Sequence, residues 1–183
     1  MPRNIEIKAA IANVDSLLSR ASAVAGCVPQ CIEQDDSFFR VPQGRLKLRR
    51  FADGSAELIH YQRSDIRAAK ASDYVRVPVA EPERLQVALA RACGLLGRVQ
   101  KTRWLWQVEA GGFSTRIHLD RVWGLGDFME LEVVLKDGQS DAAGAQVAEA
   151  LMDSLGLASA PRLAGAYLDM GVDTAATPQR CSG

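Results

Sequence analysis

Charged side chains recur two positions apart along several segments of this chain, with apolar side chains at the positions between them. Glu6 and Lys8 flank Ile7, and Lys47 and Arg49 flank Leu48. Residues two apart share one face of a β-strand, so this alternation predicts strands with one apolar face and one charged face. Similar alternation recurs in the segments 56–63, 99–109, 114–123 and 127–135. A chain of such strands must fold so that the apolar faces are buried against other elements.

Strands outnumber helices along the chain. We expect strands at 4–11, 28–34, 37–41, 45–51, 56–63, 73–79, 99–109, 114–123 and 127–135, with a polar connection at 64–72. Helices are expected at 13–26, with Asn13 as the N-cap, at 82–94 and at about 140–155. About eight strands with three helices between them predict an α+β fold, in which the antiparallel strands form a closed or nearly closed β-barrel.

Length and composition narrow the classes of function. The 183 residues suit one domain, expected to span 1–172 with a flexible tail at 173–183. Basic and acidic residues both number 22, and this balance argues against a protein that coats nucleic acid. No apolar run approaches the roughly 18 residues of a membrane helix. The four cysteines lack the paired spacing of a zinc site and suit a reducing compartment, so a cytoplasmic protein is expected.

The charges at alternate positions allow two interpretations. In an antiparallel sheet, a charged face commonly faces water. Like charges on neighbouring positions repel, however, and Glu130 and Glu132 form such a pair while three other strands carry basic residues. Carboxylates at i and i+2 can share a hard metal such as Mg²⁺, and Arg and Lys around it can hold phosphates. On this second interpretation, the charged faces point into a barrel that binds a polyanion and a divalent cation.

The charged motifs also match a known family in order and spacing. Asn4, Glu6 and Lys8 fit an E-x-E-x-K signature except at its first position. Further matching segments cover nearly the whole chain: 44–49, 57–63, 101–103, 116–120, 125–132 and 165–170. By these motifs the sequence resembles the CYTH superfamily, the triphosphate tunnel metalloenzymes, in its class IV adenylyl cyclase-like and thiamine triphosphatase-like branch.

The resemblance implies a fold, a ligand and a set of site residues. The implied fold is an eight-stranded antiparallel β-barrel whose tunnel binds a triphosphate with Mg²⁺ or Mn²⁺. The implied metal ligands are Glu6, Glu130 and Glu132, with Asp120 as a further contributor, and the implied catalytic residues are those three glutamates and Lys8. The implied phosphate ligands are Lys8, Lys47, Arg49, Arg63, Lys101, Arg103 and Arg116.

Several functions remain open from the sequence alone. The favoured one is a metal-dependent phosphohydrolase acting on ATP, tripolyphosphate or thiamine triphosphate, because hydrolysis requires less of a site than cyclisation. The alternatives are a class IV adenylyl cyclase and a binding module with little turnover, the latter because Asn4 replaces a carboxylate with an uncharged amide. A barrel whose inner charges only pair with each other is a further alternative, and the implied lining of seven cations and four carboxylates argues against it. We expect a monomer or a homodimer.

The remaining polar and aromatic residues receive simpler interpretations. His60 and His118 are expected to be packing or hydrogen-bonding residues, although His118 shares a face with Arg116 and could from there contact substrate. The three tryptophans are expected to pack on the outside of the barrel under helices. These are Trp104, Trp106 and Trp123.

Overall fold

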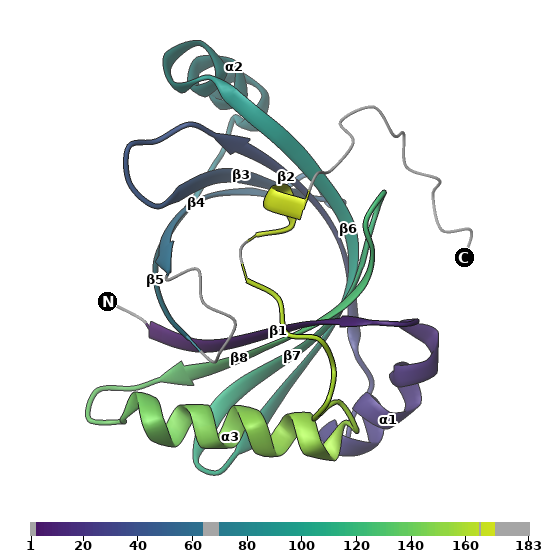
Figure 1. Cartoon of the computed structure of the whole chain (residues 1–183). Coiled ribbons are helices and arrows are strands. Elements are labelled where there is room, and N and C mark those ends of the chain that lie inside the picture. Colours follow the sequence, from purple (N-terminus) through teal and green to yellow (C-terminus); the bar gives the residue numbers. More distant parts are fainter. Residues whose placement is uncertain (1–2, 64–69, 165, 171–183) are drawn as a thin grey trace.

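Eight strands close into a barrel in the computed structural model, which describes residues 3–63, 70–164 and 166–170 (Figure 1). The strands are β1 (Arg3–Ile11), β2 (Gln30–Phe39), β3 (Arg45–Phe51), β4 (Ala56–Arg63), β5 (Lys70–Pro78), β6 (Leu95–Ala110), β7 (Phe113–Val122) and β8 (Gly126–Leu135). Around the barrel their order is β1-β5-β4-β3-β2-β6-β7-β8, and β8 pairs with β1. Neighbouring strands all pair antiparallel, which confirms the expected fold class.

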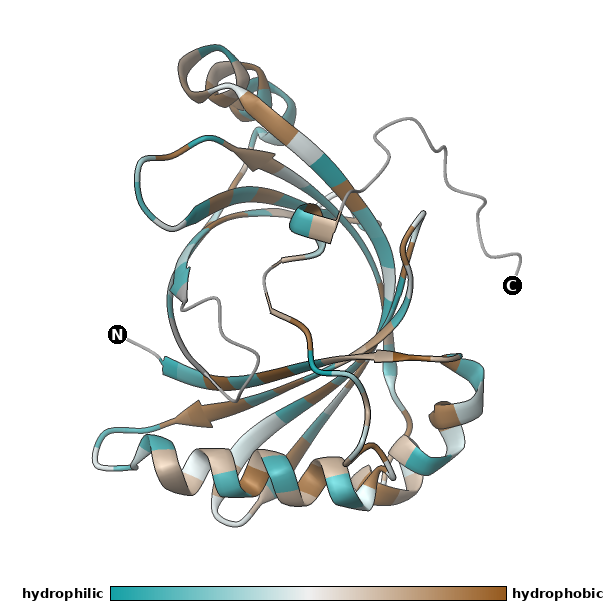
Figure 2. Cartoon of the chain, viewed as in Figure 1, coloured by the Kyte–Doolittle hydropathy of each residue, from teal (hydrophilic) through white to brown (hydrophobic). Residues whose placement is uncertain are grey.

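The main hydrophobic core lies outside the barrel, between its strands and two helices. The helical elements are α1 (Asp15–Ala25), α2 (Pro82–Cys93), α3 (Asp141–Ser154) and the 3₁₀ helix η1 (Tyr167–Met170). Ile7, Ile117 and Leu131 point outward and pack with Leu17 of α1 and Met152 of α3. Figure 1 shows α3 lying along the outer face of the barrel, and Figure 2 shows hydrophilic and hydrophobic residues alternating along the strands. Among the described residues, no helix is both long enough and apolar enough to cross a membrane.

Outward-facing aromatic and histidine side chains take the structural roles expected of them. Trp106 is almost completely buried in this core, where its Nε1 donates a hydrogen bond to Ser22 Oγ of α1 at 3.3 Å. Trp104 packs against the same core. The His60 Nε2 lies 3.1 Å from the Gln43 carbonyl oxygen, within hydrogen-bond distance. None of these three side chains lines the barrel interior.

The structure corrects the expected strands at β2 and β5, and β6 begins at Leu95, earlier than the expected 99. β2 is a single continuous strand, although separate strands were expected at 28–34 and 37–41. The acidic residues Asp35 and Asp36, which are poor strand formers, are kept in the strand by ion pairs with Arg98 on one face and Arg49 on the other. β5 begins at Lys70, inside the expected connection 64–72. Residues 64–69 and the expected tail 173–183 lie outside the described part of the chain.

Candidate active site

The barrel encloses a cavity of about 270 Å³ that is lined by charged side chains. The inward positions of each strand alternate with the outward apolar ones, so the charged faces point inward as the second interpretation expected. The basic lining residues are Lys8, Lys47, Arg49, Arg76, Lys101, Arg103 and Arg116. The acidic lining residues are Glu6, Asp36, Glu57, Glu130 and Glu132. Arg63 lies at the end of β4, and its side chain is outside the described part of the chain.

Asp36 organises two of the expected phosphate ligands. It lies directly opposite Arg49 in the β2–β3 register. Its two carboxylate oxygens accept hydrogen bonds from Arg49 Nε and Nη2, both at 2.7 Å, and the Lys47 ammonium donates another at 2.8 Å. Burial raises the pKa of Asp36, but Arg49 and Lys47 outweigh burial and hold this pKa far below its usual range. Asp36 is a site residue that the sequence did not reveal.

Asp120 makes the same arrangement on the neighbouring pair of strands. It lies opposite Arg103 in the β6–β7 register, and the guanidinium donates to its two oxygens at 2.7 and 2.6 Å. The Lys101 ammonium donates a further hydrogen bond at 2.8 Å, and the Tyr167 hydroxyl donates one at 2.9 Å. Asp120 is completely buried. Its oxygens are therefore engaged by protein donors, and the structure does not bring it into the metal-ligand group described below.

Two lysines of the cavity, the buried Lys101 and the partly buried Lys47, are destabilised in their charged form. Burial and the adjacent Arg103 lower the pKa of Lys101 to about 7. Burial and the adjacent Arg49 lower the pKa of Lys47 to about 8. The neighbouring carboxylates raise both pKa values, but they do not compensate fully for burial. The cavity therefore favours an additional anion close to these two ammonium groups.

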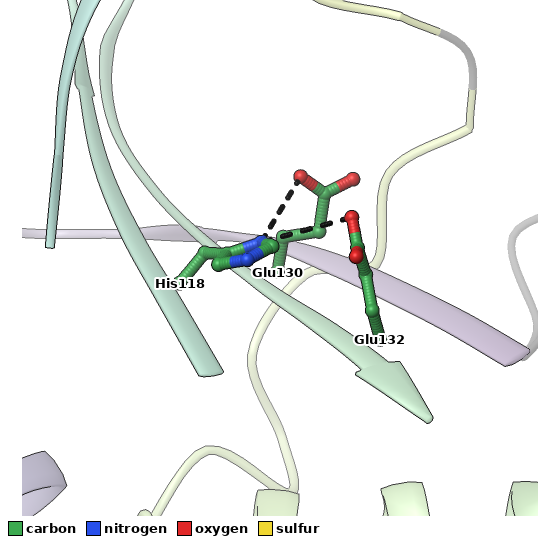
Figure 3. A group of neighbouring side chains, drawn as sticks. All are labelled: His118, Glu130 and Glu132. Carbon is green, nitrogen blue, oxygen red and sulfur yellow. Dashed lines mark ion pairs between the residues drawn. The ribbon is translucent and has the colours of Figure 1, made fainter. Parts of the chain in front are cut away.

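Two glutamates and a histidine converge on one side of the cavity (Figure 3). Ligand atoms of His118, Glu130 and Glu132 all lie within 4.8 Å of one another. The His118 Nδ1 is 3.8 Å from Glu130 Oε2 and 3.8 Å from Glu132 Oε1. The register explains this convergence, because His118 faces Glu130 across the β7–β8 pair and Glu132 is two positions further along β8.

The first strand places two oxygen-bearing side chains in the same cavity. Glu6 lies directly opposite Glu132 in the β1–β8 register, an arrangement in which like charges repel. Asn4, two positions earlier, is almost completely buried, and its Oδ1 has no hydrogen-bond partner among the described residues. Three carboxylates and an unsatisfied amide oxygen are hard donors that fit Mg²⁺ or Mn²⁺. The donor set on β1 and β8 thus fits a divalent cation.

Cations of the barrel also hold these carboxylates in place. Arg103 donates to Glu130 at 2.9 Å, and the Lys8 ammonium lies 3.7 Å from the same carboxylate. Arg116 lies 3.2 Å from Glu132. Burial raises the pKa of Glu130, but Lys8 and Arg103 hold it well below its ordinary value. Glu130 is therefore ionised at neutral pH.

His118 is a member of the group that the sequence assigned chiefly to packing. Burial, together with the adjacent Arg103, lowers the pKa of His118 below its usual value of 6.5, so the imidazole is neutral at pH 7. A neutral ring offers a lone pair to a proton or a metal. His118 shares the inward face of β7 with Arg116, and this spacing was the available signal that it belongs to the site. Its partners Glu130 and Glu132 became identifiable only with the register.

The inner charges are more nearly balanced than the sequence implied. Seven cations and five carboxylates line the cavity among the described residues, and Asp120 behind them brings the acidic total to six. Asp36 and Glu57 were not among the four expected carboxylates. Ion pairs within the lining therefore neutralise much of its charge. The lowered pKa values of Lys47 and Lys101 identify the two ammonium groups that these pairs stabilise incompletely.

Comparison with known proteins identifies the family to which this barrel belongs. The CYTH domain matches residues 2–167, and the chain therefore belongs to the CYTH family. Members of this family are triphosphate tunnel proteins that depend on metal and are generally enzymes. No curated protein matches the sequence significantly.

Solved structures of similar fold come from several organisms. A protein from Pyrococcus horikoshii is 22% identical, with a TM-score of 0.77 over 91% of this chain and 98% of that one. A protein from Pyrococcus furiosus is 20% identical, with a TM-score of 0.75 over the same shares of the two chains. A candidate adenylate cyclase from Vibrio parahaemolyticus is 19% identical, with a TM-score of 0.69 over 91% of this chain and 96% of that one. At these identities the similarity establishes the fold.

Proposed function

We propose that this protein is a metal-dependent phosphohydrolase that acts on organic or inorganic triphosphates bound inside the barrel. The observation that carries the proposal is the meeting of seven basic side chains and a carboxylate–imidazole group in one cavity of about 270 Å³. Such a lining complements a polyanion together with a hard cation. Membership of the CYTH family supports the same class of ligand.

The proposed phosphate ligands surround the cavity. They are Lys8, Lys47, Arg49, Lys101, Arg103 and Arg116, and Arg63 is added from its sequence motif. A guanidinium binds two phosphate oxygens as a fork, whereas an ammonium acts as a point charge. Because Lys47 and Lys101 have lowered pKa values, a bound triphosphate would stabilise their charged forms. Substrate would thereby supply the negative charge that the cavity lacks.

Glu6, Glu130 and Glu132 are the proposed metal ligands, with His118 beside them. A bound Mg²⁺ or Mn²⁺ would supply charge neutralisation at the phosphoryl oxygens and a lowered pKa for bound water. Water attacks the terminal phosphorus, the bond from that phosphorus to the bridging oxygen breaks, the diphosphate portion leaves with that oxygen, and orthophosphate is formed. Arg103 and Arg116 stabilise the charge that develops on the transferred group. The neutral His118 is proposed to accept the proton of the attacking water.

A class IV adenylyl cyclase is the second candidate. In that reaction the ribose 3′-hydroxyl attacks the α-phosphorus, and pyrophosphate leaves. Tyr61 and Tyr74 face each other across β4 and β5 and line the same cavity. Their rings are surfaces on which an adenine could stack, and this observation favours the candidate. A binding module without turnover is the third candidate, and Asn4 is the reason for keeping it.

Product analysis tests the proposal. The protein is incubated with tripolyphosphate, ATP or thiamine triphosphate, with Mg²⁺, Mn²⁺ or EDTA, and phosphorus NMR identifies the products. We expect orthophosphate from at least one substrate, with at least 100-fold loss in EDTA. Cyclic AMP with equimolar pyrophosphate would establish the cyclase instead. Binding without any product would favour the binding module.

Matched variants test the metal assignment within the same assay. Glu130→Gln and Glu132→Gln keep the shape of the side chain and remove its charge, so each should lose at least tenfold of the activity at limiting Mg²⁺. Glu149→Gln makes the same change at an exposed site on α3 and serves as the control. Full activity of both inner variants at limiting Mg²⁺ would contradict the metal assignment.

A further inference from the structure

The chain beyond α3 returns to the barrel and contributes a side chain to its interior. Residues 161–163 run along β1, where the Ala10 amide donates to the Pro161 carbonyl at 3.1 Å and the Leu163 amide donates to the Lys8 carbonyl at 2.9 Å. Figure 1 shows η1 at the barrel opening, next to β6. Tyr167, the first residue of η1, lines the cavity and is almost completely buried.

Tyr167 contacts two lysines and the buried carboxylate of Asp120. Its ring centroid lies 3.9 Å from the Lys8 ammonium and 5.0 Å from the Lys101 ammonium. Its hydroxyl donates to Asp120 Oδ2 at 2.9 Å. The Phe128 ring, 4.9 Å away between centroids, packs against it. One side chain from the end of the domain therefore touches charged groups of β1, β6 and β7.

We propose that Tyr167 is a positioning residue of the triphosphate site, which holds Lys8 and Lys101 so that their ammonium groups remain available to phosphate. This inference rests on the proposed function, because it concerns the same cavity. An aromatic face attracts an ammonium group through its quadrupole and carries no net negative charge. A carboxylate in the same place would neutralise the lysine and compete with the substrate for it. Lys101 and Lys8 already pair with Asp120 and Glu130, and the ring adds an attractive contact for both ammonium groups without adding further negative charge.

Three variants distinguish the contributions that the Tyr167 ring, the Tyr167 hydroxyl and the packing of η1 make to triphosphate binding. Tyr167→Leu removes both ring and hydroxyl, so we expect the Kd for tripolyphosphate, measured by calorimetry without metal, to rise at least tenfold. Tyr167→Phe keeps the ring, and its Kd should stay within threefold of the native value. Leu168→Ala weakens the packing of the same short helix without touching either lysine, and its Kd should stay within twofold.

The outcomes decide between a positioning role and a merely structural one. A Kd for Tyr167→Leu within twofold of native, in a folded protein, would overturn the proposal. An equal loss of affinity in Leu168→Ala would also overturn it, because docking of the segment would then explain the effect. If Tyr167→Leu does not fold, Tyr167→Phe and Tyr167→Met carry the same comparison between a retained and a lost ring.

Lysine acetylation provides a readout that does not depend on triphosphate binding. Lys8 and Lys101 are almost completely buried, whereas Lys136 is exposed. Under brief treatment with acetic anhydride, followed by mass spectrometry, Tyr167→Leu should increase labelling of Lys8 and Lys101 at least fivefold relative to Lys136. Tyr167→Phe should not. If the native protein binds no tripolyphosphate, the proposed function fails, and the labelling pattern still tests the contact between Tyr167 and the lysines.

Discussion

Asp36 and Asp120 make the same arrangement on adjacent pairs of strands. Each lies opposite an arginine in the strand register and accepts from both nitrogens of one guanidinium edge, and each also accepts from the lysine two positions before that arginine. The barrel therefore carries two copies of a lysine–arginine pair held by one buried aspartate. Such pairing orients the cations before any ligand arrives, which reduces the cost of ordering them on binding.

Removing one of these aspartates should be much more destabilising than removing a surface partner. Asp120→Asn leaves Arg103 and Lys101 buried with less compensating charge, and we expect a loss of about 3–5 kcal/mol in the free energy of unfolding. Asp35→Asn removes the partner of the half-exposed Arg98 and should cost at most about 1 kcal/mol. Urea unfolding measures both variants, and equal losses would contradict this assignment of the buried aspartate.

The affinity for a triphosphate should decrease as the pH rises from about 7 to 9. Lys101 and Lys47 have pKa values of about 7 and about 8, both lowered from 10.5, so each loses its proton and its charge as the pH passes through that value. Only the protonated forms attract phosphate. Calorimetry across this range should show the decrease, and Lys47→Gln should reduce it above pH 8. The ionisation of the ligand itself affects the native protein and Lys47→Gln equally, so the difference between their pH profiles reports on Lys47. Identical pH profiles of the two proteins would contradict the prediction.

Among the elements, strands bounded by clear turn signals were predictable, whereas the register between strands distant in sequence was not. The bounds of β3 and β4 agree with the sequence expectation because Asp53 and Gly54 mark the turn between them. The inward direction of Lys47 and Arg49 followed from alternation. Asp36 was missed because its partners lie on another strand, and only the register brings them together. The same reason explains why His118 was not joined to Glu130 in advance.

The turn that leads into β3 has a strict steric requirement. Gly44 has a φ of +68°, and a Cβ there would lie 2.6 Å from the Tyr61 carbonyl oxygen, a backbone atom that cannot move independently. Gly54 has a φ of +86°, but a Cβ there meets nothing within 4 Å. Gly54→Ala should therefore cost about 1–2 kcal/mol from the backbone conformation alone, and Gly44→Ala clearly more. Thermal unfolding compares the pair, and equal losses would contradict the steric clash.

At the scale of the whole molecule, the polar interior and the external core predict a large effect of ligand on stability. Helices α1 and α3 pack the core outside the strands, while the cavity is lined with destabilised cations. Tripolyphosphate at about 100 times its Kd should stabilise the fold by roughly 2.7 kcal/mol. For a chain of 183 residues this corresponds to about 5–11 °C in Tm.

Differential scanning fluorimetry measures this shift with sodium sulfate of equal ionic strength as the control. Mg²⁺ should increase the shift because it fits between the carboxylates and the bound phosphates. Arg49→Ala should reduce the shift by removing one of the guanidinium forks. An unchanged Tm at millimolar tripolyphosphate would contradict the proposed ligand.

The pairing of β1 with β8 also fixes when the site can exist during synthesis. Glu6 belongs to residues 3–11, and its neighbours Glu130 and Glu132 belong to residues 126–135, so the three proposed metal ligands come together in the strand register at the seam where the barrel closes. Contacts so distant in sequence form late, since the intervening chain must first be made and ordered. A nascent chain that ends before β8 has its first glutamate but no partner for it. Closure of the barrel and assembly of the proposed metal site are therefore one event.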